Sequence, residues 1–240
     1  MDRDIGAPAT FHLKSLGDVE LTGPSGDLLQ GRRKILALLA YLVRRGNGPL
    51  PRAELATLLW GERPQSRAMS SLREALHQLR GALGDALETD RKAVSRRPGA
   101  VGLDLTELEV ALEARRFRDA LDLWGGEFLP ELEDAGTGEF RNWLEGERQA
   151  LRKKVFRALQ ALVQGAEERG DWNEAVRWAE QWAELSALDE GAQATLIRTL
   201  RLAGRTREAA ERADAVRKRF REELGTDPDL PEVPGPEDQA

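Results

Sequence analysis

The chain has 240 residues, 40% of them hydrophobic, and a formal net charge of −6 from 36 Lys and Arg against 42 Asp and Glu. This length and composition suit a globular chain with room for two modest domains. It has no cysteine and only two histidines, His12 and His77, which lie far apart in sequence, so disulfides, thiolate sites and cysteine nucleophiles are excluded and no histidine-based metal site is expected.

The first predicted elements are those of a small α/β domain over residues 10–104. After a start (1–9) that reads as disordered, alternating residues over 10–21 predict two short strands, and glycines and proline then indicate a turn at Gly23 to Asp27. The segment 31–45 is too apolar for a surface helix and predicts a central core helix. A shorter helix over residues 52–60 follows it.

The third predicted helix, 66–83, is amphipathic, and Ser66 suits its N-cap. One face is apolar, with Leu72, Leu76, Leu79 and Leu83. The opposite face and its flanks carry Arg67, Ser70, Ser71, Arg73, Glu74, His77, Gln78, Arg80 and Gly81. A helix fixed to a core by leucines and offering such groups outward fits the major groove of DNA. An ordinary surface helix with a solvated polar face fits the same pattern.

A basic hairpin is predicted after this helix. Two short strands around a Pro98-Gly99 turn are expected between residues 87 and 105, and the basic residues of this segment are Arg91, Lys92, Arg96 and Arg97. Strands, three helices and a hairpin, in that order, give a winged helix-turn-helix with an extra N-terminal sheet. Residues 1–104 hold 16 Lys and Arg against 12 Asp and Glu, whereas the remainder holds 20 against 30. Unless this asymmetry is chance clustering, it indicates a basic, DNA-facing module joined to an acidic one.

Beyond residue 105 the chain reads as helix. The segments 170–175 and 204–209 share Gly, Glu and Ala positions at a separation of 34 residues, the period of tetratricopeptide helix-turn-helix repeats. The prolines and acidic residues after Thr226 predict a disordered acidic tail. We therefore expect an N-terminal α/β winged helix-turn-helix domain (10–104), an all-α tetratricopeptide-like domain (105–226) and a tail (227–240).

Signatures of enzymes and membrane proteins are missing from the pattern. Gly26 and Gly31 have the glycine spacing of a phosphate-binding loop, but Arg32 and Arg33 follow where Lys and a hydroxyl residue are required. These arginines are better interpreted as contacts to a DNA backbone, or as a solvated first helical turn. No catalytic or cofactor constellation is seen. Without a signal pattern or an apolar run of about 20 residues, we expect a cytoplasmic protein with no membrane partner.

The chain resembles bacterial transcriptional activators of the antibiotic regulatory type, which join an OmpR-like winged helix to an all-helical bacterial transcriptional activator domain. The matching motifs of the first half are Leu16-Gly17, Gly31-Arg32-Arg33-Lys34, Leu55 through Leu59-Trp60, Ser71-Leu72-Arg73 and Leu79-Arg80-Gly81-Ala82-Leu83-Gly84. Those of the second half are Gly126-Glu127-Phe128-Leu129-Pro130, Trp143 with Glu147-Arg148, Ala203-Gly204-Arg205 with Glu208-Ala209, and Arg219 through Asp227-Pro228. The resemblance covers about residues 11 to 228. With no receiver or ATPase domain in the sequence, a short stand-alone member is expected.

The resemblance implies a regulator that binds direct repeats at promoters as a side-by-side dimer, while its helical domain supports dimerisation and contacts RNA polymerase. For the residues we expect base reading by Arg73, His77 and Gln78, with Glu74 on the same face. Phosphate contacts are expected from Ser70, Ser71, Arg80, Arg32 and Arg33, and wing contacts from Arg96 and Arg97. Two alternatives stay open: a winged helix that has lost specific DNA binding beside helical repeats that bind a protein partner, and an enzyme with an unrecognised acidic site.

Overall fold

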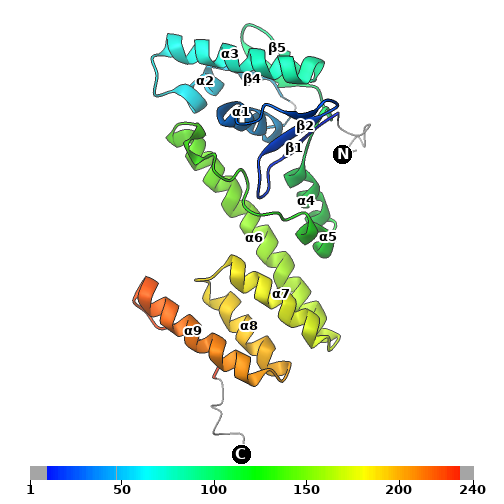
Figure 1. Cartoon of the computed structure of the whole chain (residues 1–240), viewed down its shortest axis with the longest axis vertical. Coiled ribbons are helices and arrows are strands. Elements are labelled where there is room, and N and C mark those ends of the chain that lie inside the picture. The colour runs from blue at the N-terminus through cyan, green and yellow to red at the C-terminus, as the bar shows by residue number, and fades with distance from the viewer. Residues whose placement is uncertain (1–9, 47, 233–240) are drawn as a thin grey trace, which may run out of the picture. The chain divides into compact units, whose positions relative to one another are not determined.

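The computed structural model describes residues 10–46 and 48–232 (Figure 1). The disorder expected for residues 1–9 and for the end of the tail, 233–240, concerns positions outside the described residues. The chain forms two compact units, Met1–Arg152 and Lys153–Ala240. The junction predicted near residue 104 lies inside the first unit.

The first unit begins with a four-stranded sheet of order β3-β2-β1-β7. Its strands are β1 (Phe11–Lys14), β2 (Glu20–Gly23), β3 (Gly26–Leu28) and β7 (Val101–Leu103). β1 pairs antiparallel with β2 and parallel with β7, so that Leu13 lies between Leu21 and Leu103, and all three side chains are buried. The two strands predicted within 10–21 are confirmed. The turn predicted from Gly23 to Asp27 is shorter than expected because Gly23 and Gly26 already pair across β2 and β3.

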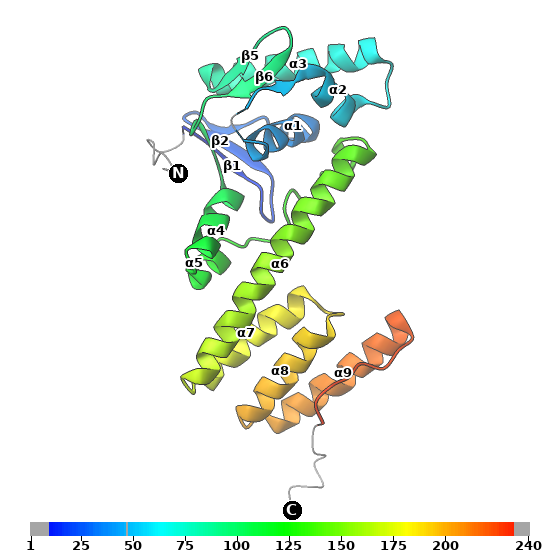
Figure 2. The same cartoon turned by 180° about the vertical axis from the view of Figure 1, so that it is seen from behind.

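Three helices follow: α1 (Arg33–Arg44), α2 (Arg52–Trp60) and α3 (Gln65–Leu83). Every residue of α1 from Ile35 to Val43 is buried, because this helix lies between the N-terminal sheet and the α2–α3 pair (Figures 1 and 2). The four leucines predicted to fix α3 are buried as well. Ser66 is not its N-cap. Pro64 holds that place, and its carbonyl accepts from the backbone N–H groups of Arg67 and Ala68.

The wing is a second sheet of order β4-β6-β5. It consists of β4 (Leu50–Pro51), β5 (Leu87–Thr89) and β6 (Ala93–Arg96), with a 3₁₀ turn, η1 (Gly84–Ala86), before β5. The predicted turn at Pro98-Gly99, with a short strand on either side of it, is confirmed, but these strands, β6 and β7, lie in different sheets and do not form the expected hairpin. Residues 97–100 instead cross to β7 in the other sheet. The hairpin turns at Asp90, whose carboxylate accepts from the N–H groups of Lys92 (2.6 Å) and Ala93 (2.7 Å).

The first unit continues with α4 (Asp104–Glu113), α5 (Phe117–Asp122), a 3₁₀ turn, η2 (Glu133–Ala135), and the start of α6 (Gly138–Glu168). Asp104 is only 8% exposed and ties the start of α4 to the end of β1. Its carboxylate accepts from the Ser15 N–H (2.9 Å), the Ser15 hydroxyl (2.5 Å) and the Leu16 N–H (3.0 Å). The connection from α5 to α6 also bonds to this edge, since the N–H of Leu129 donates to the Ser15 carbonyl at 2.7 Å.

The second unit is all helix. After the end of α6 come α7 (Trp172–Leu185), α8 (Glu190–Leu202) and α9 (Thr206–Leu224), with α8 between its two neighbours (Figure 2). Gly170 and Gly204 each turn the chain into the next helix with a positive φ, +72° and +77°. The Ala of each repeat, Ala175 and Ala209, is fully buried. The repeat seen in the sequence therefore corresponds to a repeated helical turn. Within the described ranges, no helix is both long and apolar enough to cross a membrane.

Removing the Asp104 carboxylate should destabilise the first unit. Asp104→Ala leaves the buried N–H and O–H groups of Ser15 and Leu16 without their acceptor, so we expect a loss of about 3 kcal/mol in the free energy of unfolding. Urea denaturation measures it. The control is Asp18→Ala, which removes an exposed pair with Lys14 and should cost less than about 1 kcal/mol. Equal losses for the two variants would contradict this role of Asp104.

Candidate nucleic-acid interface

The outward face of α3 holds most of the side chains selected from the sequence. Ser70, Arg73, Glu74 and His77 are all exposed on it. Within the described part of the chain, the side chains of Ser70, Arg73 and His77 form no hydrogen bond or ion pair. These three side chains are therefore available to a ligand without breaking an internal contact.

Three other candidates on α3 are held by neighbours. Gln78 donates through Nε2 to the Glu74 carboxylate at 2.9 Å. The Ser71 hydroxyl accepts from Arg63 at 3.1 Å, and Arg80 reaches the Thr89 hydroxyl in β5 at 3.4 Å. Each of these contacts is exposed and replaceable. They orient the side chains along α3 and toward the wing.

The tip of the wing is basic. Arg91 and Lys92 are exposed at the turn, and Arg52 donates to the Asp90 carbonyl at 2.9 Å from the start of α2. The two N–H bonds from Ala93 and Lys92 lower the pKa of the Asp90 carboxyl, so that the turn is held by a charged acceptor. The position of Arg91 and Lys92 at the tip was not predicted from the sequence. The signal that could have done so was Asp90 followed by two turn residues, since Asp favours the first position of a turn.

Arg96 and Arg97, both expected on the wing, differ in their surroundings. Arg97 is exposed just after β6. Arg96 is half-buried at the base of β6, donates to the Val43 carbonyl of α1 at 3.3 Å, and has a buried Nε without a hydrogen-bond partner. Burial lowers the pKa of its guanidinium. Arg96 therefore joins the wing to the end of α1.

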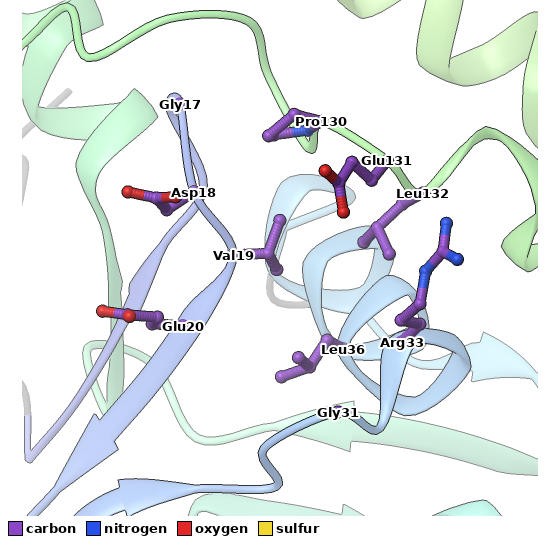
Figure 3. Close-up of a pocket in the computed structure, with 10 residues that line it drawn as sticks. All are labelled: Gly17, Asp18, Val19, Glu20, Gly31, Arg33, Leu36, Pro130, Glu131 and Leu132. Carbon is purple, nitrogen blue, oxygen red and sulfur yellow. The ribbon is translucent and has the colours of Figure 1, made fainter.

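Arg32 and Arg33 lie at the start of α1. Arg33 lines a cavity of about 280 Å³ between the turn before β2, the start of α1 and residues 130–132 (Figure 3). None of the lining residues belongs to α3 or to the wing. Asp18, Glu20 and Glu131 share the lining, so the charge there is mixed. The structure therefore does not bring Arg33 together with the other candidates.

The bacterial transcriptional activator domain family matches residues 94–231. The chain belongs to this family. That membership agrees with the resemblance found in the sequence, and the family is one of transcriptional regulators, not of enzymes.

Curated relatives include the regulatory protein AfsR of Streptomyces griseus, 28% identical over 95% of this chain, and AfsR of Streptomyces coelicolor, 29% identical over 89%. The chain spans 26% and 22% of the length of these relatives. A solved structure of Mycobacterium tuberculosis EmbR in complex with a low-affinity phosphopeptide matches 92% of this chain and 62% of that one, with a TM-score of 0.66 and 24% identity. This likeness supports the fold: a winged helix followed by a helical domain.

Replacing each of the two neighbouring wing arginines should change the free energy of unfolding by different amounts. Arg96→Ala removes a half-buried donor to Val43 and its packed stem, and should lower the free energy of unfolding by about 1 kcal/mol. Arg97→Ala, its exposed neighbour, should change it by less than about 0.5 kcal/mol. Urea denaturation of both variants tests this. If Arg97→Ala proves the more destabilising change, the assignment of Arg96 to the fold fails.

Proposed function

We propose that this protein is a sequence-specific, DNA-binding transcriptional regulator that acts on the chromosome in the cytoplasm. The observation that carries the proposal is the outward face of α3, where unpartnered Arg and His side chains stand on a helix whose other face is fixed by buried leucines. Residues 10–104 would be the reading module and residues 105–226 the activator module. Membership in a family of transcriptional activators supports this division of labour.

The side chains of α3 divide into two roles. Arg73 and His77 would contact base edges, and Gln78 would join them by exchanging its bond to Glu74 for one to a base. Ser70, Ser71 and Arg80 lie at positions suited to phosphates. A guanidinium can pair with both acceptors of a guanine, which makes Arg73 the main determinant of sequence.

The wing would hold the duplex without reading it. Arg91, Lys92 and Arg97 are exposed cations on or beside the hairpin, and contacts of this kind supply affinity that falls with salt. Arg96 would act indirectly by holding the wing to α1. Arg32 and Arg33 remain candidates for phosphate contacts only apart from this site, because the cavity that Arg33 lines includes no residue of α3 or of the wing.

The finer features of the proposal come from the family resemblance. We propose that the protein activates transcription from direct repeats as a homodimer, and that its helical domain contacts RNA polymerase. Sedimentation of the protein with a DNA fragment bearing one or two half-sites would give the stoichiometry of this complex.

Substitutions in α3 and on the wing should affect binding in different ways. Arg73→Ala should cost roughly 1–3 kcal/mol of specific binding and relax the sequence preference. Arg97→Ala should weaken all sequences alike and reduce the slope of log K against log salt by about 1. Fluorescence anisotropy on specific and random DNA at several salt concentrations separates the two. Equal losses on both DNAs for both variants would overturn these roles.

The direct test of the proposed function is a selection. The purified protein is incubated with sheared genomic DNA from its own source at near-physiological salt, and the retained fragments are sequenced. Recovery of a few promoter fragments that share a direct repeat is the expected result. Uniform recovery, or none, would overturn the proposal.

A further inference from the structure

The turn of the helix-turn-helix is held from outside the motif. The last carbonyls of α2 need donors, as at any helix end. The Thr57 carbonyl takes the Gly61 N–H at 2.9 Å, and the Trp60 carbonyl takes the Arg63 N–H at 2.9 Å. The remaining two, of Leu58 and Leu59, are served by distant residues.

Thr137 serves the Leu58 carbonyl with two donors. Its backbone N–H lies at 3.0 Å and its hydroxyl at 2.8 Å from that oxygen, across 79 residues of sequence. A Cβ added at Gly61 would lie 3.4 Å from Thr137 Cγ2, so the side chain also packs against the start of the turn. Thr137 directly precedes α6, and its carbonyl accepts the Arg141 N–H at 3.0 Å. One residue therefore joins the first turn of α6 to the end of α2.

Lys34 serves the Leu59 carbonyl. Its ammonium donates at 2.9 Å and lies 5.6 Å from the centre of the Trp60 ring. Burial, assisted by the nearby Arg63, lowers the pKa of this ammonium. A cation at the C-terminal end of a helix is also favoured by the helix dipole. Lys34 comes from α1, inside the winged helix, so of the two residues that donate to these carbonyls Thr137 is the one from the helical part of the chain.

The position of Thr137 is fixed in turn by α6 and by β1. Arg148 of α6 donates to the carbonyls of Phe128 and Leu129 at 2.8 Å each. Between these residues and Thr137, Leu132 and Ala135 are buried. The segment is thus anchored at intervals by buried side chains. A displacement of α6 would move the donor that holds the end of α2.

We propose that Thr137 is a positioning residue for DNA reading, which couples the start of α6 to the turn that aims α3. The proposal rests on the proposed function of α3. Among the described residues, Thr137 donates from the helical part of the chain to the last turn of α2, which leads into the turn from Gly61 to Pro64. Loss of the Thr137 hydroxyl leaves α3 folded on its leucines and the Thr137 N–H on the Leu58 carbonyl, but removes the shorter of the two bonds that hold the angle at which α3 enters the groove.

The test uses the full chain with Thr137→Val, which keeps the shape and the N–H but removes the hydroxyl donor. We expect the selected promoter fragment to bind about fivefold more weakly, which is the effect of losing one hydrogen bond. Binding of random DNA should change less than about twofold. Amide hydrogen exchange over residues 61–66 should accelerate by a similar factor. Thr137→Ser, which retains the hydroxyl, should restore both readouts.

Two controls make the result decisive. Thr199→Val removes a matched threonine hydroxyl from the second unit and should leave DNA binding unchanged. Arg73→Ala tests the reading face itself. If Arg73→Ala lowers specific binding while Thr137→Val changes neither binding nor exchange, the coupling is overturned.

Equal losses by Thr137→Val on specific and random DNA, together with a lower unfolding midpoint, would also overturn it, since a general structural role acts on both. If no fragment is selected and Arg73→Ala has no effect, the proposed function fails. The exchange rates of residues 61–66 then still decide whether Thr137 holds the turn.

Discussion

The buried guanidinium of Arg148 is the contact on which the first unit most depends. It is 7% exposed, donates to the Phe128 and Leu129 carbonyls, and pairs with Glu133 at 2.6 Å. A buried charge is costly unless it is paired and hydrogen-bonded. Here Nε donates to the Phe128 carbonyl, and Nη2 donates to the Leu129 carbonyl and pairs with Glu133. The segment it holds reaches the sheet through Leu129 and the end of α2 through Thr137. One side chain of α6 thus fixes both the sheet and the helix-turn-helix.

A second set of contacts joins α6 to the core helix of the winged helix. Arg44, near the end of α1, pairs with Glu109 of α4 and Glu147 of α6, each at 2.6 Å. One turn away on each helix, the rings of Tyr41 and Trp143 meet edge to face at 4.8 Å. These contacts explain why the compact unit extends to Arg152 rather than ending near residue 104. The winged helix and the first helices after it share one packed interior.

The parts of the fold that the sequence predicted are those set by local periodicity. The leucine spacing predicted the buried face of α3 because leucines three or four residues apart lie on one side of a helix. The glycines at 170 and 204 predicted the turns between helices because the same short motif recurs after 34 residues. The hairpin tip was not predicted because the Pro98-Gly99 pair is a stronger turn signal than Asp90, whose carboxylate caps the actual turn. The different surroundings of Arg96 and Arg97 depend on strand register, which two adjacent arginines do not reveal. Arg44–Glu147 and Thr137–Leu58 join residues 103 and 79 positions apart, beyond the reach of any local pattern.

These long-range contacts bear on how a regulator of this kind could be controlled. Leucines fix α3 to α1 and α2 through a wide, non-directional contact, so the helix stays folded under small displacements. The angle of the helix-turn-helix depends instead on a few directional bonds at the end of α2, and hydrogen bonds weaken steeply with misalignment. A small displacement of α6 is therefore expected to change the angle of α3 before it unfolds α3. If α3 reads DNA as proposed, that separation would allow specific binding to be altered without unfolding the domain.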